Sequence, residues 1–185
     1  IYVANDGSPC WLFRNLGGWK FEEIGLKAGV SLDGRGEPLA AMGIARGDVD
    51  SDGRLDLAVT NFLGRSTVIF RNEGRGTHAD HSDASGVTNA TRSVLGFGVA
   101  LVDFDGDGLP ELIQANGHVL DRERLGTPFA MKPTLMRNLG GRFRRDPLID
   151  RKSLGRGLAV GDLDNDGKPA VVLTSLDAPT IVLWN

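Results

Sequence analysis

Three short acidic segments carry the residues with the clearest capacity for chemistry. In segment 48–56, aspartates occupy positions 1, 3, 5 and 9, and a glycine occupies position 6. Segment 103–111 repeats this spacing with glutamate at position 9, and segment 162–170 repeats it with alanine there. Carboxylates packed this closely repel one another by kcal/mol amounts at a protein surface unless a cation lies among them. The spacing therefore predicts a cation at each segment.

The ligand chemistry favours calcium. Ca²⁺ takes about six to eight oxygen ligands, and side chains at positions 1, 3 and 5 of a curled loop can converge on one point. The glycine permits the sharp turn, the carbonyl of position 7 is expected to point inward, and position 9 adds a carboxylate. Oxygen ligation argues against zinc and copper, and several carboxylates in one cage favour Ca²⁺ over Mg²⁺. The expected ligands are Asp48, Asp50, Asp52, Arg54 and Asp56; Asp103, Asp105, Asp107, Leu109 and Glu111; and Asp162, Asp164, Asp166 and Lys168.

The three segments are not expected to bind calcium equally. Ala170 offers no side-chain ligand at position 9, so two well-formed sites and a third, weaker one are predicted. An EF-hand shares positions 1, 3, 5, 6 and 7, but its glutamate at position 12 is replaced here by Val59, Gln114 and Leu173. Asp and Gly also form ordinary turns, but three equivalent copies disfavour that explanation. The sequence therefore argues against a calcium sensor and for calcium loops.

An internal repeat must position these loops. Segments 43–61, 98–116 and 157–175 align without a gap, and short apolar runs bounded by Gly, Asp, Asn and Pro flank each loop, as is typical of strands. A third strand ending in Asn is expected after each segment, at 66–72, 133–138 and 180–185. A weaker fourth strand is expected around 20–24, 77–82 and 142–145.

Four short strands per repeat predict the blade of a β-propeller, because each blade buries its faces against its neighbours. A solenoid is the alternative, although its repeats are usually shorter. We therefore expect an all-β propeller segment of about three and a half four-stranded blades. The expected units are a partial blade at 1–33, a blade at 39–92 with loop 48–56, a blade at 94–152 with loop 103–111, and an incomplete blade at 154–185 with loop 162–170.

Several motifs resemble known families. Segment 97–100 (FGVA) followed by 103–108 (DFDGDG) resembles the FG-GAP or VCBS-type repeat. The strand ends at 12–15, 69–72 and 135–138, together with segments 22–30 and 115–119, resemble the cartilage acidic protein and ASPIC/UnbV-type family. This resemblance implies an extracellular propeller of about seven or eight blades with Ca²⁺ in the blade loops.

Composition narrows the function classes. The net charge of −3 gives no reason to expect nucleic-acid binding. The sequence contains no run of about 18 consecutive apolar residues, which would predict a membrane span. Calcium sites of modest affinity fill where calcium is near millimolar, which favours an extracellular, periplasmic or cell-surface location. We find no motif of a catalytic or cofactor-binding site.

The sequence favours a binding or adhesion scaffold for a protein or glycan ligand over an enzyme. A propeller-based carbohydrate-active enzyme, a lyase or hydrolase, is the alternative, because propellers host many functions. The remaining blades are expected to come from a longer chain or from a second copy.

Overall fold

Strands form where the apolar runs predict them, with ends shifted by one or two residues. The computed structural model describes residues 1–147 and 149–185; Leu148, inside the expected unit 94–152, lies outside the described residues. Sheet I contains β1 (Tyr2–Val3), β2 (Trp11–Gly17) and β3 (Lys20–Glu23), and sheet II contains β4 (Ile44–Gly47), β5 (Asp56–Val59), β6 (Val68–Gly74) and β7 (Thr77–Asp80). Sheet III contains β8 (Gly96–Val102), β9 (Glu111–Asn116), β10 (Thr134–Asn138) and β11 (Phe143–Asp146), and sheet IV contains β12 (Gly155–Gly161), β13 (Ala170–Ser175) and β14 (Ile181–Leu183).

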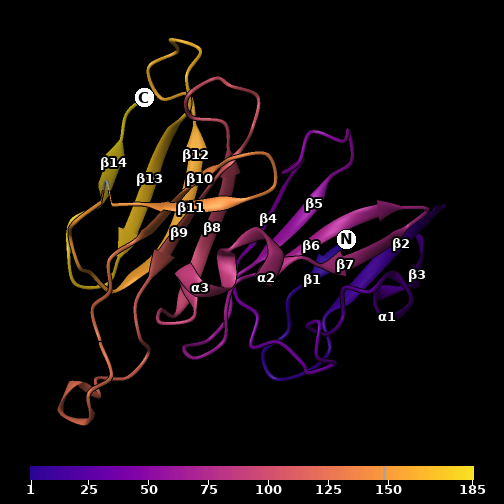
Figure 1. Cartoon of the computed structure of the whole chain (residues 1–185), viewed down its shortest axis with the longest axis horizontal. Helices are drawn as coiled ribbons and strands as arrows, with labels where there is room; N and C mark the ends of the chain where they lie inside the picture. Colours follow the sequence, from indigo (N-terminus) through magenta and orange to yellow (C-terminus); the bar gives the residue numbers. More distant parts are fainter. Residues whose placement is uncertain (148) are drawn as a thin grey trace.

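Each sheet is an antiparallel meander in which strands adjacent in sequence are hydrogen-bonded neighbours. The sheets follow one another in chain order, from the indigo N-terminal sheet to the yellow C-terminal sheet (Figure 1). The described chain is therefore an all-β structure of four antiparallel sheets, consistent with a β-propeller-like fold. The division into blades at the expected boundaries stays a prediction.

The first strands of sheets II, III and IV bring the sheets together, since β8 contacts both β4 and β12. Glycine is needed for this approach: a Cβ at Gly98 would lie 2.5 Å from the Leu158 nitrogen, and one at Gly43 would lie 2.0 Å from the Phe97 carbonyl oxygen. The glycines that start the first two segments, Gly43 and Gly98, therefore permit close packing of neighbouring first strands.

The cores lie between successive sheets. Between sheets II and III, Ala58 and Ile69 pack with Leu112 and Met136. Residues one position along the same strands face the other way, so that Val59 and Phe70 pack toward sheet I, and Ile113 and Leu135 pack toward sheet IV. Sheets II and III are thus buried on both faces.

The outer faces of sheets I and IV carry exposed apolar side chains. On sheet I, Trp11 is 48% exposed, and its ring packs edge-on against Phe13 at 6.1 Å. On sheet IV, Val182, which pairs with Val172, is 39% exposed. Neither outer face is covered by the described residues.

Short helices occupy the connections between sheets. Helix α1 (Gly25–Ala28) follows sheet I, α2 (Ser82–Ser85) and α3 (Val87–Thr91) join sheet II to sheet III, and the 3₁₀ helix η1 (Glu123–Leu125) lies between β9 and β10. Among the described residues, no helix has the length and apolar character needed to cross a membrane.

Candidate metal centres

The three acidic loops occupy equivalent places. Each joins the first strand of a sheet to the second, in sheets II, III and IV, and the loops lie along the upper edge of Figure 1. Each brings three carboxylates together, with one oxygen from each within 4.8 Å of the others: Asp48, Asp50 and Asp56; Asp103, Asp105 and Glu111; and Asp162, Asp164 and Asp166. Ca²⁺ binds oxygens at about 2.3–2.6 Å, so ligands on opposite sides are about 5 Å apart. The clusters therefore have a size that could hold a metal ion.

Hydrogen bonds from the main chain curl each loop in the same way. The aspartate at position 1 accepts an N–H from the glycine at position 6, at 2.8 Å for Asp48 and 2.9 Å for both Asp103 and Asp162. Those glycines have φ between +83° and +88°, the left-handed region that glycine enters without strain. Position 4 is left-handed too, and Ser51, Gly106 and Asn165 occupy it. The sequence analysis missed this second requirement, although Gly and Asn at that position signal it.

The acid at position 9 connects each of the first two loops to its sheet. Asp56 is fully buried and accepts N–H bonds from Val49 at 2.9 Å and from Asn72 at 2.7 Å. Glu111 accepts the equivalent bonds from Phe104 at 2.9 Å and from Asn138 at 3.5 Å. One side chain thus holds the loop and the third strand together.

The electrostatics of these buried acids favour a nearby positive charge. Burial raises the pKa of Asp56 and of Glu111, although their main-chain hydrogen bonds partly oppose the shift. Neighbouring aspartates raise each pKa further. Ionised carboxylates are therefore costly here unless a cation lies beside them.

Asp50 provides the most direct test of fit. Its Oδ1 atom is buried and has no hydrogen-bond partner among the described residues. Its Oδ2 atom lies 4.0 Å from the Arg71 Nη1 atom, at the limit of an ion pair. Buried carboxylate oxygens normally have a partner, so a metal ligand role suits this atom.

Asp52 and Asp107 are not members of the carboxylate groups in the first two loops. Asp52 and Asp107 accept the N–H of the residue at position 7, at 2.9 Å from Arg54 and 2.8 Å from Leu109. Asp52 also forms an ion pair with Arg54. These two aspartates lie outside the three-carboxylate groups, whereas Asp166, which accepts the equivalent N–H from Lys168 at 2.9 Å, belongs to the third group. The inward carbonyls of Arg54, Leu109 and Lys168 stay a prediction.

The third cluster differs in three ways. Its aspartates are all exposed, and Ala170 gives no carboxylate, so Asp166 completes the group. In sheets II and III, an arginine approaches the aspartate at position 3, and Arg137 lies 3.4 Å from Asp105. Trp184 stands at the corresponding place in the last repeat. This cluster has fewer neighbours that would fix its geometry.

A repeated asparagine connects neighbouring sheets, which the sequence analysis did not foresee. The Asn138 side chain donates to the Pro110 carbonyl of its own sheet at 3.1 Å and to the Val49 carbonyl of the preceding loop at 2.8 Å. Asn185 donates to Phe104, the corresponding residue of the loop before it. The conspicuous sequence signal was the Asn that ends each third strand.

One family model agrees with the repeat. Residues 48–113 match the family model of the FG-GAP-like repeat, which supports an FG-GAP repeat protein. No curated protein matches the chain. Among solved structures, the chain is similar to a lectin of Agrocybe aegerita described as recognising non-reducing terminal N-acetylglucosamine, with 18% identity and a TM-score of 0.33. The alignment covers 98% of this chain and 61% of that lectin, so the chain spans less than two thirds of its length.

Proposed function

We propose that the chain is a calcium-stabilised segment of a β-propeller that acts outside the cell or at its surface as a scaffold for binding or adhesion. The observation that carries the proposal is the Asp48–Asp50–Asp56 cluster, where three carboxylates converge and the buried Asp50 Oδ1 has no hydrogen-bond partner within the described part of the chain. The same arrangement recurs in the next loop with Asp103, Asp105 and Glu111.

Calcium would have a structural role in this scheme. Each loop joins two adjacent strands, so a bound ion offsets the repulsion of its carboxylates and holds the turn in place. An ion that binds the folded state alone stabilises that state in proportion to its occupancy. The first two loops would hold Ca²⁺ well and the third more weakly, because Ala170 removes one ligand.

The wider context of the proposal comes from the repeat. The four sheets would be the blades at 1–33, 39–92, 94–152 and 154–185, in an extracellular protein of the ASPIC/UnbV type. The exposed apolar faces of sheets I and IV would be covered by further blades, from a longer chain or a second copy. The ligand would be a protein or a glycan.

Thermal unfolding with and without calcium tests the metal role. Melting in 2 mM Ca²⁺ should occur several degrees above melting in EDTA, on the order of the 2–4 °C expected per kcal/mol for a chain of this size. Mg²⁺ at the same concentration should restore less of the difference, since it prefers stricter octahedral geometry. Identical melting curves in Ca²⁺ and in EDTA would refute the calcium proposal.

A glycan array combined with a turnover screen on the same saccharides tests the scaffold role. Binding without product formation supports a scaffold. Product formation would instead support the alternative of a carbohydrate-active lyase or hydrolase.

A further inference from the structure

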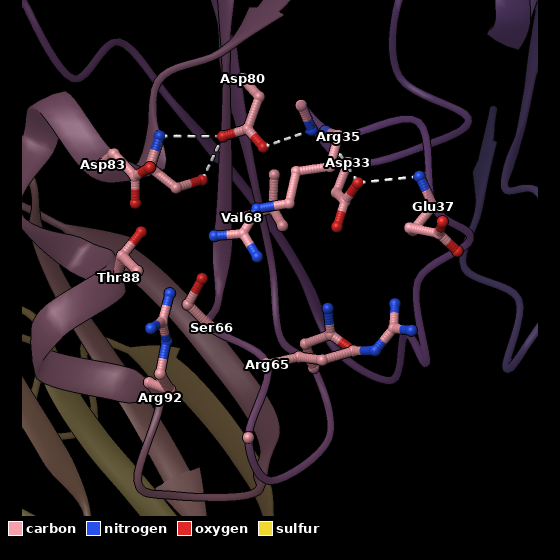
Figure 2. Close-up of a pocket in the computed structure, with 14 residues that line it drawn as sticks. Asp33, Arg35, Glu37, Arg65, Ser66, Val68, Asp80, Asp83, Thr88 and Arg92 are labelled. Carbon is pink, nitrogen blue, oxygen red and sulfur yellow. Dashed lines mark hydrogen bonds between the residues drawn. The ribbon is translucent and has the colours of Figure 1, made fainter.

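A polar pocket opens at the end of sheet II opposite the acidic loops. The acidic loop joins β4 to β5, whereas the pocket is lined by the β5–β6 connection, by the turn at 33–37 and by the α2–α3 segment (Figure 2). The pocket has a volume of about 370 Å³. That volume lies at the lower end of the range of about 300–1,000 Å³ that is usual for small-molecule sites.

Two carboxylates stabilise the turn that lines one side of this pocket. Asp33 Oδ1 accepts N–H bonds from Arg35 at 3.0 Å and from Glu37 at 2.9 Å, which closes the turn. Asp80 Oδ2 accepts the Gly34 N–H at 2.7 Å, which fixes the turn against the end of β7. These contacts leave both carboxylates engaged with the main chain, and they hold Arg35 over the pocket.

Two guanidinium groups face the pocket from different elements. Figure 2 shows the Arg35 side chain extending over its centre and the Arg92 side chain rising beside Ser66 and Thr88. Neither guanidinium has a hydrogen bond or an ion pair with residues 1–147 or 149–185. Arg65, by contrast, donates to the Pro38 carbonyl at 2.5 Å. Two uncommitted guanidinium groups at one cavity are suited to bind an oxyanion such as a carboxylate.

Thr88 adds an independent indication of a ligand. This residue is only 5% exposed, and its Oγ1 atom is buried without a hydrogen-bond partner among the described residues. One turn later, the Thr91 hydroxyl donates to Val87 at 2.8 Å and accepts from Thr67 at 2.9 Å. Figure 2 shows the Thr88 hydroxyl facing the pocket. A ligand oxygen in the pocket would satisfy this group, which otherwise costs stability.

The other charged side chains that line the pocket limit the class of ligand that it can bind. Asp83 and Glu37 line the pocket together with the carboxylates of Asp33 and Asp80, so a bare anion would meet repulsion as well as attraction. Val68 is the one apolar side chain among the described lining residues, so no aromatic platform is available to stack on a neutral sugar. The pocket therefore suits a small ligand with one carboxylate and several hydroxyl groups.

We propose that this pocket binds a sugar acid, with its carboxylate on Arg35 and Arg92 and its hydroxyl groups on Thr88 and Asp83. The proposal rests on the binding role proposed above but not on the calcium loops, which lie at the other end of the sheet. It assigns one ligand class and one location to that role.

Isothermal titration at constant ionic strength, with the protein saturated with Ca²⁺, tests the ligand class. Sodium glucuronate and sodium galacturonate should bind at least tenfold more tightly than glucose, galactose, acetate or sulfate. If the neutral sugars bound as tightly as the uronates, the carboxylate would not be recognised. If acetate or sulfate bound as tightly as the uronates, the pocket would be a general anion site. Either result, or no binding of any probe, would overturn the proposal.

Three substitutions locate the binding. Arg35→Gln and Arg92→Gln should each weaken uronate binding at least tenfold. Thr88→Val should weaken it about threefold to tenfold while leaving the melting temperature of the free protein unchanged or raised, because it removes an unpartnered buried hydroxyl. Arg144→Gln, at an exposed position of β11, is the matched control and should bind as the parent protein does. Loss of uronate affinity in the control alone, or in none of the variants, would place the ligand elsewhere.

Repeating the titration in EDTA separates this proposal from the calcium proposal. If the protein stays folded, the pocket should keep its uronate affinity within about threefold. Uronate binding without a calcium effect on melting would refute the metal role alone, and a calcium effect without uronate binding would refute the pocket alone.

Discussion

Asp56 and Glu111 each take part both in the hydrogen bonding of a sheet and in a carboxylate cluster. Their oxygens accept main-chain N–H groups from the loop and from the third strand, and the same side chains contribute to the carboxylate clusters. A carboxylate oxygen has two lone pairs, so accepting an N–H leaves it able to bind a cation. Position 9 therefore connects the loop chemistry to the sheet.

Substitution at position 3 should separate the strong sites from the weak one. Asp50→Asn keeps the shape of the side chain but removes its charge, so calcium stoichiometry measured by equilibrium dialysis should fall by about one ion per chain. Asp164→Asn should change the stoichiometry less, because the exposed third cluster is expected to be partly filled. Asp121→Asn, outside the loops, is the control. Equal losses for Asp50→Asn and Asp164→Asn would contradict the predicted ranking.

His78 should make stability depend on pH. Burial lowers the pKa of His78, although a hydrogen bond to the Ala28 main chain opposes the shift, and its Nδ1 atom has no partner among the described residues. Because the folded-state pKa lies below the unfolded value of about 6.5, the unfolded chain takes up the proton first. The stability contribution is therefore present above that pH and is lost as the pH falls.

Thermal melts between pH 7.5 and 5.5 check this expectation. The melting temperature of the parent protein should fall toward pH 5.5, and His78→Gln should flatten that fall. His81→Gln is the matched control and should retain the parent dependence. A fall of the same size in both variants would show that another group is responsible.

At the residue scale, the sequence indicated which carboxylates lie together better than it indicated what each one does. The spacing predicted Asp48, Asp50 and Asp56 as ligands of one ion, and the structure places one carboxylate oxygen of each within 4.8 Å of the others. It did not distinguish Asp52, which lies outside this group and accepts the Arg54 N–H. Aspartate has the same tendency to close a turn as to bind a cation, so the residue type alone does not separate these roles.

At the scale of elements, the third strand of each repeat does more than extend a sheet. Asn138 ends β10 and donates to carbonyls of two different loops, one of them in the sheet before it. It also accepts the Gly141 N–H at 2.9 Å. The strand end thus fixes its own hairpin and the position of its sheet against the preceding one.

Asn138→Ala should be costlier than the equivalent substitution in sheet II. The side chain is buried and makes three hydrogen bonds, each worth about 1 kcal/mol, so urea unfolding should show a loss of about 2–4 kcal/mol. Asn72→Ala removes only the bonds to Leu55 and Gly74 and should cost about 1–2 kcal/mol. Equal costs would mean that the bond to Val49 does not contribute.

Strands were predictable from the sequence, but the helices between sheets II and III were not. Apolar runs bounded by turn residues identify strands directly. Helices α2 and α3 have four and five residues, mostly Ser, Thr, Asp and Asn, which have modest helix propensity. Tertiary packing determines them, since Ser85 and Val87 are buried and Val87 belongs to the core between sheets II and III. Such packing has no periodic signature in so short a segment.

At the scale of the whole molecule, the chain has a covered middle and two uncovered apolar faces. Trp11 and Val182 lie on opposite outer sheets, so the exposed face of one chain can meet the other exposed face of the next. This is a head-to-tail contact, which forms a ring if the rotation closes and a filament if it does not.

The isolated chain should therefore associate with itself as its concentration rises. Light scattering after size exclusion should show a mass above that of the 19.8 kDa monomer. Trp11→Lys or Val182→Lys should restore the monomer, because burying a lysine in such a contact is costly. Leu125→Lys, in the exposed η1 helix, is the control. A parent chain that is monomeric at every concentration would contradict this prediction.

The burial of both faces of sheet III affects how the register of its strands is set. Every residue of β9 is buried, and Leu112 and Ile113 pack into different cores, so sliding this strand by one residue would move its apolar side chains from one core to the other instead of exposing them to water. Hydrophobicity alone therefore discriminates poorly between the correct alignment and a slipped one. The polar contact of Glu111 with Asn138 does discriminate, because only one alignment pairs them. Glu111, the acidic residue at the end of the loop, thus also helps to set the register of the sheet.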